Sequence, residues 1–152
     1  MEETPKTLDG PRCREIGRTC ACYNLRRAAR SITRLYDDFL RPSGLKTTQF
    51  SVLMTTKMCG PVTITKLADL TVTERTTLTR NLTILEKKGL IRIEPGLDRR
   101  ERQVALTEAG HEALVKAIPL WETVQEHVEK GLGQDRLISF LTELRGIVAL
   151  TR

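Results

Sequence analysis

The sequence predicts a mainly α-helical protein that carries one small β-hairpin. Apolar residues recur every three to four positions over most of the 152 residues, which is the spacing of amphipathic helices. Between residues 90 and 106 the spacing changes to two, in two short segments joined by a charged loop, as in a hairpin. Glycines and prolines fall between the segments and separate them. The predicted order is therefore four helices, a hairpin and two more helices.

Composition indicates a soluble globular protein with a basic surface. Charged residues make up 29% of the chain and hydrophobic residues 39%. No apolar run is long enough to span a membrane, and the N-terminus lacks the apolar segment of a signal peptide, so we expect a cytoplasmic protein. The formal net charge of +6 favours a polyanionic partner, chiefly nucleic acid.

The N-terminal part of the chain is expected to be an arm followed by a long helix. Residues 1–15 contain two prolines, a glycine and charges of both signs, a composition typical of a flexible terminal arm. From about residue 16 to residue 40, apolar residues recur at helical spacing with arginines between them. The segment "RPSGL" at 41–45 then ends this helix.

The middle of the chain is predicted to contain three short helices, over about residues 48–58, 63–70 and 74–88. Thr63 is placed to cap the second of them, and Gly89 is placed to end the third. Only the turn "TVT" separates the second helix from the third. The third helix is expected to bury one stripe, formed by Leu78, Leu82 and Leu85.

Two strands and two further helices complete the predicted chain. Residues 90–94 and 102–106 alternate apolar and polar side chains, and a loop of about seven residues joins them. A long helix follows to about residue 130, which Pro119 is expected to bend, and a last amphipathic helix follows "GLGQ". Two short helices joined by a tight turn and followed by a hairpin are typical of a winged helix-turn-helix domain.

The exposed face of the helix at 74–88 suggests contact with DNA. Its residues combine short hydroxyl groups with long cationic side chains. Arginine pairs with guanine O6 and N7, threonine offers a hydroxyl or a methyl group to base edges, and a helix N-terminus favours phosphate. The alternative is an ordinary solvated face, but a threonine-rich face has poor helix propensity and no evident gain in stability. The face consists of Arg75, Thr76, Thr77, Arg80 and Asn81.

The charged loop of the hairpin, "DRRER", extends this prediction. Arg99, Arg100 and Arg102 are placed to reach a minor groove, where a narrow groove attracts arginine. We expect Asp98 to orient one of these arginines through a charge-assisted hydrogen bond. The alternative is a solvated turn, which is what most charge runs are.

Two segments, "LADLTVTERTTLTRNLTILEKKGLI" and "DRRERQVALTEAG", resemble the MarR family of winged-helix transcriptional regulators. The segment "LRRAARSITRLYDDFLRPSGLKTTQFSVL" is similar to the family's first two helices, so the resemblance covers roughly residues 20–150. The wing signature of the family is Asp-x-Arg with a following Leu-Thr-x-x-Gly. Its residues here are Asp98, Arg100, Leu106, Thr107 and Gly110.

The resemblance implies a homodimer that binds double-stranded DNA at a near-palindromic operator, often as a repressor. It divides the chain into a flexible N-terminal arm (1–15), a dimerisation helix (16–45), a winged helix-turn-helix DNA-binding domain (46–107) and C-terminal dimerisation helices (108–152). An apolar stripe on the last helix gives dimerisation a physical motive, unless the stripe packs on its own subunit. By analogy, Arg100 enters the minor groove. The stripe consists of Leu137, Ile138, Leu141 and Leu144.

The start of the DNA-binding helix departs from the family pattern. Family members often have Ser or Asp there, where a short side chain caps the helix. Here Glu74 occupies that position and Thr73 precedes it. Thr73 is therefore an alternative cap, which would move the helix start by one residue.

The resemblance also implies a signal that releases the regulator from DNA, often a small aromatic or phenolic molecule. Such an effector would bind in a pocket between the dimer helices and the winged domain, with an arginine as partner for its carboxylate. The alternative is that the same side chains are plain core and dimer packing. The candidates are Arg30 (or Arg34), Tyr36, Phe39, Phe50, Met54 and Trp121.

A thiol switch is the second kind of signal that the resemblance implies. Cys22 lies at a position resembling the reactive cysteine of the family's organic-hydroperoxide sensors, and Tyr36 matches a supporting tyrosine. Two other supporting tyrosine positions are Arg26 and Thr47 here. A neighbouring cysteine, Cys13 or Cys20, would resolve the oxidised thiol. The alternative to a thiol switch is that all four cysteines are inert thiols.

Sequence patterns of catalysis and of cofactor binding are absent. We find no Gly-rich phosphate loop, no His-Glu metal motif and no nucleophile elbow. The spacing of Cys20 and Cys22 is not the Cys-x-x-Cys spacing of zinc sites. We therefore expect no enzymatic activity, no cofactor and no metal. The alternative from another class is a protein-binding adaptor on a winged-helix scaffold.

Overall fold

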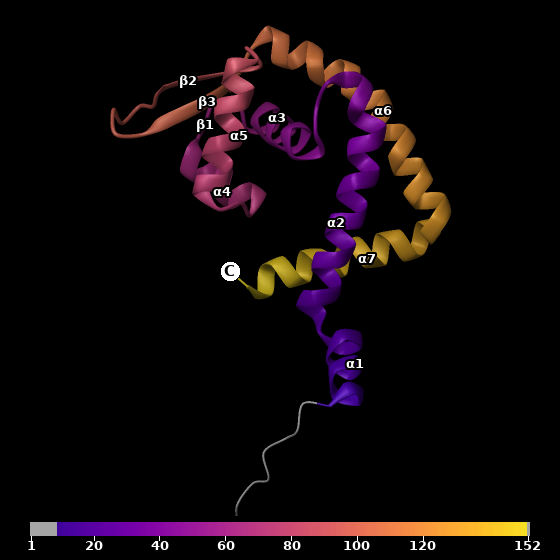
Figure 1. The fold of residues 1–152 in the computed structure, drawn as a ribbon. Coiled ribbons are helices and arrows are strands. Elements are labelled where there is room, and N and C mark those ends of the chain that lie inside the picture. The colour runs from indigo at the N-terminus through magenta and orange to yellow at the C-terminus, as the bar shows by residue number, and fades with distance from the viewer. Residues whose placement is uncertain (1–8, 152) are drawn as a thin grey trace, which may run out of the picture. The chain divides into compact units, whose positions relative to one another are not determined.

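The computed structural model describes residues 9–151, and the chain divides into two compact units, residues 1–35 and 36–152 (Figure 1). The first unit contains helix α1 (Gly10–Thr19) and most of helix α2 (Ala21–Leu40). The other elements belong to the second unit. They are η1 (Arg41–Ser43), α3 (Thr47–Cys59), β1 (Val62–Thr63), α4 (Ile64–Thr71), α5 (Arg75–Lys87), β2 (Ile91–Pro95), β3 (Arg102–Leu106), α6 (Glu108–Leu132) and α7 (Gln134–Leu150).

The prediction of a flexible arm over residues 1–15 is wrong for its last part, which is the beginning of helix α1. Residues 10–15 are helical, because the Asp9 side chain accepts a hydrogen bond from the Arg12 backbone N–H at 2.8 Å and caps the helix. Pro11 lies in the first turn, where its missing N–H costs no helical hydrogen bond. The helix expected from residue 16 is interrupted at Cys20, whose backbone is extended. Residues 1–8 of the predicted arm lie outside the described residues.

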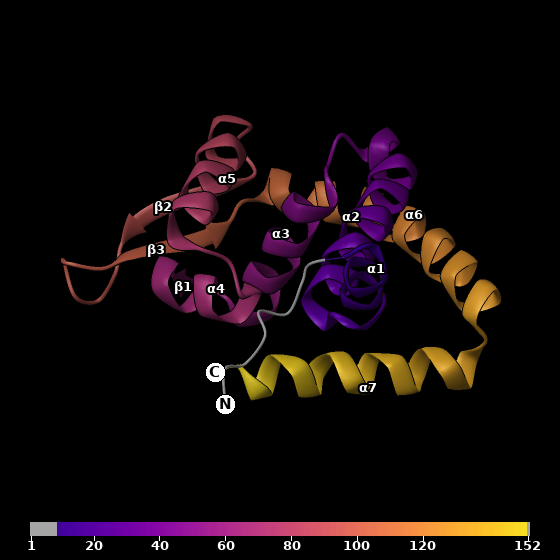
Figure 2. The same ribbon diagram turned by 60° about the horizontal axis from the view of Figure 1, so that its bottom comes forward.

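The mainly α fold with a small sheet is confirmed, and the sheet has one strand more than the hairpin. Its order is β1-β3-β2, and both pairings are antiparallel. Ile91 and Ile93 pair with Leu106 and Val104, so these apolar side chains share one face of the sheet. Figure 2 shows the sheet beside α4 and α5. Strand β1 is two residues long and has no periodicity from which it could be predicted.

The core of the second unit joins the helices of the winged domain to the sheet. Leu78, Leu82 and Leu85 of α5 are buried as predicted, and they belong to one cluster with Leu53, Leu67 and Val104. Thr63 caps α4 by accepting a hydrogen bond from the Lys66 N–H, also as predicted. Gly89 has a φ of +71° and follows the end of α5, which is the conformation that favours glycine there.

A tight joint connects the end of α5, the start of β2 and the start of α6. The Thr107 hydroxyl donates to the Gly89 carbonyl at 2.6 Å and accepts from the Gly110 N–H at 3.0 Å. The Thr107 N–H donates to the Leu90 carbonyl. A Cβ on Gly110 would lie 2.0 Å from that same carbonyl oxygen, so only glycine fits at this position.

Helix α6 continues through Pro119 without a break and curves along its length (Figure 1). Proline donates no backbone hydrogen bond, which accounts for curvature at that point. Among residues 9–151, no helix is both long and apolar enough to cross a membrane.

Candidate nucleic-acid interface

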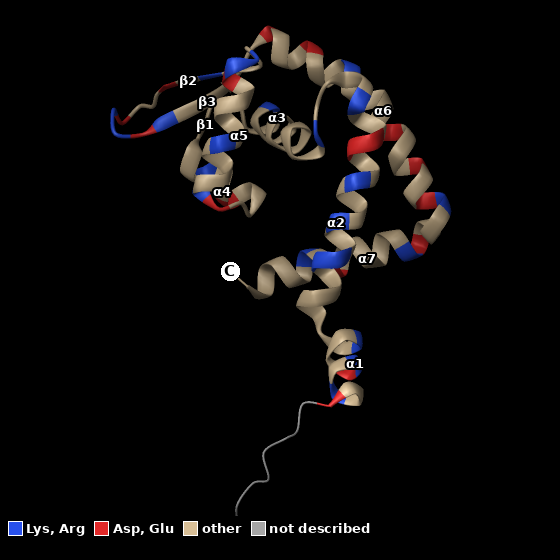
Figure 3. Cartoon of the chain, in the orientation of Figure 1, with Lys and Arg blue, Asp and Glu red and all other residues tan. Residues whose placement is uncertain are grey.

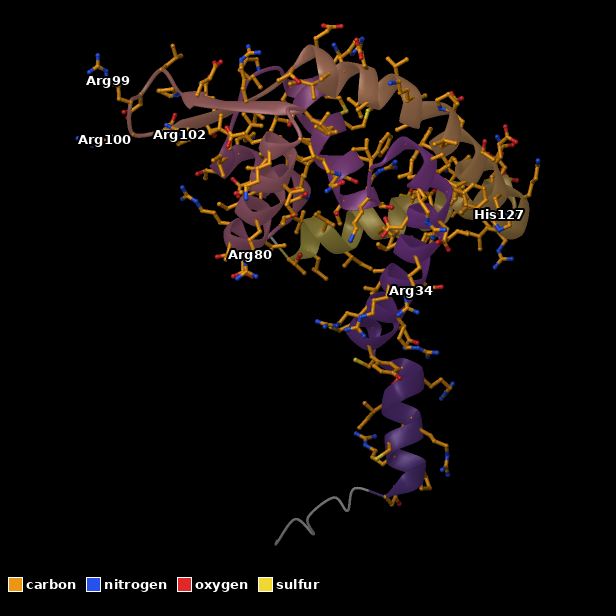
Figure 4. All side chains as sticks on the ribbon, turned by 45° about the horizontal axis from the view of Figure 1, so that its top comes forward. Arg34, Arg80, Arg99, Arg100, Arg102 and His127 are labelled. Carbon is orange, nitrogen blue, oxygen red and sulfur yellow. The ribbon has the colours of Figure 1, made fainter. Side chains whose placement is uncertain are left out.

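Helix α5 has one buried side and one free side. Its three buried leucines recur at helical spacing and fix the rotation of the helix about its own axis. On the other side, Arg75, Thr76, Thr77 and Arg80 are all exposed. Figure 4 shows Arg80 projecting away from the ribbon. The residue types that suit base edges therefore lie together on the solvent side of a rigidly held helix.

The N-terminus of α5 has no side-chain cap. Glu74 is the N-cap residue and its side chain accepts no hydrogen bond from the helix. Thr73 does not cap either, because its hydroxyl donates to the Thr71 carbonyl at 3.2 Å. The alternative start one residue earlier is therefore wrong, and the helix begins at Arg75. The first-turn N–H groups are left for solvent or for an external acceptor.

Val72, in the turn between α4 and α5, is a residue that sequence reasoning missed. Its φ of +50° and ψ of +45° lie in the left-handed region, and the described chain has no other non-glycine residue with positive φ. A β-branched residue rarely adopts this conformation. The Val72 N–H and the Thr73 N–H both bond to carbonyls of the last turn of α4, which holds the turn closed.

Asn81 differs from the other predicted contacts of α5. It is half-buried, and its side-chain amide donates to the Thr48 carbonyl of α3 at 3.4 Å. This long hydrogen bond directs the amide toward the protein. Asn81 is thus placed at the edge of the exposed face, while the two arginines and two threonines lie on it.

The tip of the wing, residues 96–101, is a turn closed by its own hydrogen bonds. The Gly96 N–H donates to the Glu101 carbonyl at 2.8 Å, and the Glu101 N–H donates to the Asp98 carbonyl at 2.9 Å. The Asp98 carboxylate accepts from the Arg100 backbone N–H at 2.9 Å. The expected bond from Asp98 to an arginine side chain is therefore replaced by one to the backbone, because a short side chain reaches the N–H two residues on.

Five arginines on the exposed side of α5 and near the wing tip make no ion pair with any residue of 9–151. Arg99 and Arg100 are exposed at the tip and Arg102 is exposed at the start of β3 (Figure 4). In the part of the chain that the structure describes, none of these three, nor Arg75 or Arg80, takes part in an ion pair. Figure 3 marks Lys and Arg positions in blue at the wing tip and on α5. Both elements can therefore meet an external anion without breaking an internal pair.

Five of the six candidate effector residues lie in the second unit, where each has a packing partner. Phe50 is buried in the core, and Met54 and Trp121 pack against it. The Tyr36 hydroxyl donates to Gln125 at 2.7 Å, and burial raises the pKa of Tyr36 above its usual value. The ring centroids of Phe39 and His127 are 6.0 Å apart. Arg30 is exposed on α2, in the first unit.

All four cysteines are free thiols. Cys13 and Cys22 are exposed, and Cys20 is half-buried at the break between α1 and α2. The Cys20 sulfur accepts from the Tyr23 N–H at 3.4 Å. Among residues 9–151, no cluster of His, Cys, Asp and Glu is suited to hold a metal ion.

Comparisons with known proteins agree with this geometry. The model of the MarR family matches residues 45–101, which span the helix-turn-helix, strand β2 and the tip of the wing. The M. tuberculosis regulator MosR, solved in complex with DNA, is 42% identical with a TM-score of 0.77, over 88% of this chain and 98% of MosR. This chain belongs to the MarR family. The family and these relatives are transcriptional regulators, not enzymes.

Two further relatives of this MarR-family chain extend the comparison. The HTH-type transcriptional regulator YwoH of Bacillus subtilis is 33% identical over 86 residues, which is 57% of this chain and 63% of YwoH. The match therefore spans less than two thirds of that curated relative. The transcriptional repressor CouR, bound to a 23-mer DNA duplex, is 26% identical with a TM-score of 0.79, over 87% of this chain and 94% of CouR.

Proposed function

We propose that this MarR-family chain is a homodimeric repressor that binds near-palindromic double-stranded DNA and is released by a small aromatic or phenolic effector. The observation that carries the DNA contact is the free side of α5. Three buried leucines hold the helix, while Arg75 and Arg80 stay exposed and make no ion pair among the described residues. A helix held in this way can enter a major groove without rearrangement.

Five residues of α5 have a role in this proposal. Arg80 pairs with a guanine edge, and Thr76 and Thr77 contact base edges through a hydroxyl or a methyl group. Arg75 and the uncapped first turn meet backbone phosphate. Asn81 contributes at the edge of the face, after releasing its long bond to Thr48.

The wing supplies the second contact of the proposed complex. Arg100 enters the minor groove, and Arg99 and Arg102 meet the flanking phosphates. The hydrogen-bonded turn at residues 96–101 supports this role, since a preformed tip loses little conformational entropy on binding.

Dimerisation is supported by the apolar surface of α7. Among its residues only Leu137 is buried within the single chain. A large exposed apolar face indicates a covering surface, and a second copy of the chain is the simplest one. A two-fold dimer would present two α5 helices about one turn of DNA apart. The exposed apolar residues are Ile138, Phe140, Leu141, Ile147, Val148 and Leu150.

Two effector mechanisms are compatible with the proposal. The first is binding of a small aromatic or phenolic acid, for which Tyr36, Phe39 and Trp121 of the second unit are the candidate side chains. Oxidation of Cys22 is the second candidate, and it is favoured by the exposure of this thiol and by the position of Cys20 two residues before it, at the break between two helices.

Fluorescence anisotropy on DNA from upstream of the chain's own gene tests the proposal. The full chain is titrated in the reduced state, after an organic hydroperoxide, after thiol rescue, and with salicylate as the aromatic probe. Loss of binding with salicylate supports the small-molecule effector, and loss that thiol reverses supports Cys22. A protein that binds neither this DNA nor any other duplex is instead an adaptor on the same scaffold.

A further inference from the structure

The N-terminal helices carry a concentration of positive charge that the proposed DNA interface does not use. Residues 10–35 contain seven arginines, one glutamate and no lysine or aspartate, a net charge of +6. The formal net charge of the whole chain is also +6. Residues 36–152 contain 17 cationic and 15 acidic side chains, although they include the whole winged domain. The excess positive charge therefore lies on α1 and α2.

Four of these arginines lie within nine residues of α2, and we call them the arginine ridge: Arg26, Arg27, Arg30 and Arg34. All four are exposed in the single chain. Arg27, Arg30 and Arg34 line an open hollow of about 620 Å³, together with Asn24, Ala28 and Ser31. Figure 3 marks Lys and Arg positions along α2 in blue, and Figure 4 shows Arg34 projecting from the helix.

Helix stability does not explain the arginine ridge. Arg26 and Arg30 are four residues apart, as are Arg30 and Arg34, and like charges at this spacing destabilise a helix by about 0.2–0.5 kcal/mol per pair. In the described part of the chain, no ion pair includes a ridge arginine. The guanidinium of Arg27 lies 5.5 Å from the ring centroid of Tyr23, which leaves its charge unneutralised.

The protein carries no excess of acidic over cationic side chains that would balance the ridge. The cations of residues 36–152 already outnumber the acids of that segment, and a second copy of the chain would add the same excess. The acidic row of α6 contains Glu122, Glu126 and Glu129, but Glu126 already lies 3.4 Å from Lys130. A phosphate backbone is an external partner that would neutralise this excess charge.

We propose that the arginine ridge is a second DNA-binding surface, which binds backbone phosphates. This inference rests on the proposed function, which supplies the polyanion. The guanidinium fork matches phosphate oxygens in a bidentate manner. Four arginines over about 12 Å of helix give one charge per about 3 Å, which is close to the roughly 3.4 Å charge spacing along one strand of duplex DNA. The ridge adds affinity without regard to base sequence.

The test compares two double variants of the full chain with equal loss of charge. R27Q/R34Q removes half of the ridge, and R136Q/R145Q removes two exposed arginines of α7. Glutamine keeps a helix propensity close to that of arginine. Binding is followed by anisotropy between low and moderate salt, on the upstream duplex and on a scrambled duplex of the same length. We expect the slope of log K against log salt to become shallower by about 0.9 per lost phosphate contact, hence about 1.8 per protomer, on both duplexes for R27Q/R34Q only.

Each outcome decides the inference. A slope for R27Q/R34Q that equals that of R136Q/R145Q overturns it. Equal slopes with weaker self-association in sedimentation also overturn it, and assign the ridge to a second copy of the chain. If the double variant loses helical content by circular dichroism, the single variant R34Q is used, with an expected change of about 0.9. If the parent binds neither duplex, the proposed function fails first and the inference fails with it.

Discussion

Replacing Gly110 by alanine tests the joint between the wing and α6. The added Cβ would lie 2.0 Å from the Leu90 carbonyl oxygen and 2.8 Å from the Leu106 Cδ1. Side-chain carbons in folded proteins essentially never approach another atom closer than 3.0 Å, so α6 and the start of β2 must separate by about 1 Å. The Leu90 carbonyl also accepts a hydrogen bond from the Thr107 N–H at 3.1 Å. Moving α6 away from the start of β2 weakens this hydrogen bond.

The expected cost follows from these contacts. Overpacking of a tightly packed site costs about 1–3 kcal/mol, and the upper value applies because the nearest atom is backbone, which cannot rotate away. The weakened hydrogen bond between two half-buried residues adds about 1 kcal/mol. Alanine regains up to about 1 kcal/mol of helix propensity. We therefore expect Gly110→Ala to lower the free energy of unfolding by about 3 kcal/mol.

Urea denaturation at one fixed protein concentration measures this change, with the fluorescence of Trp121, the single tryptophan, as probe. Gly131→Ala is the matched control, because it lies in the same helix and a Cβ there meets nothing within 4 Å. The control should match the parent to within about 1 kcal/mol. A Gly110→Ala protein as stable as the control would refute the argument that this contact excludes a side chain.

Four other perturbations have defined outcomes. Arg100→Ala should weaken binding equally on operator and scrambled duplexes, as measured by anisotropy, whereas Arg80→Ala should cost about 1–3 kcal/mol on the operator alone. An Arg80 variant with unchanged preference among sites would place base contact elsewhere. Val72→Gly should raise the free energy of unfolding by about 1 kcal/mol, because glycine adopts the left-handed conformation without strain; a loss in urea denaturation would contradict this. Burial raises the Tyr36 pKa in the folded state, so the unfolded state loses that proton first and stability should fall as pH rises above 10.0; unfolding curves of the parent and Tyr36→Phe across this range should diverge.

The helices and the hairpin could be predicted from the sequence because their apolar periods are long and regular. Leu78, Leu82 and Leu85 repeat over two turns, so the buried side of α5 and its exposed side followed from spacing alone. Strand β1 has two residues and no period, so it could not be recognised. Helix α1 was mistaken for an arm because Gly10 and Pro11 suggest a loop, whereas Asp9 makes them the first turn of a helix.

Details of the candidate site depended on tertiary contacts that a sequence does not display. Thr73 looked like a cap by residue type, but its hydroxyl donates to a carbonyl of the preceding turn. The conformation of Val72 is imposed by hydrogen bonds to the end of α4, against its own preference. Asn81 matched a base-contacting residue by type, and only the position of α3 shows its bond to Thr48.

The backbone conformation of the wing tip does not depend on its arginine side chains. Gly96, Asp98 and Glu101 close the turn through backbone groups and one carboxylate, and no arginine side chain takes part. Mutations at Arg99 and Arg100 can therefore change the charge and the reach of the tip without unfolding it. Substitution at these two positions can therefore adjust the overall affinity for DNA, while Asp98 keeps the shape of the loop.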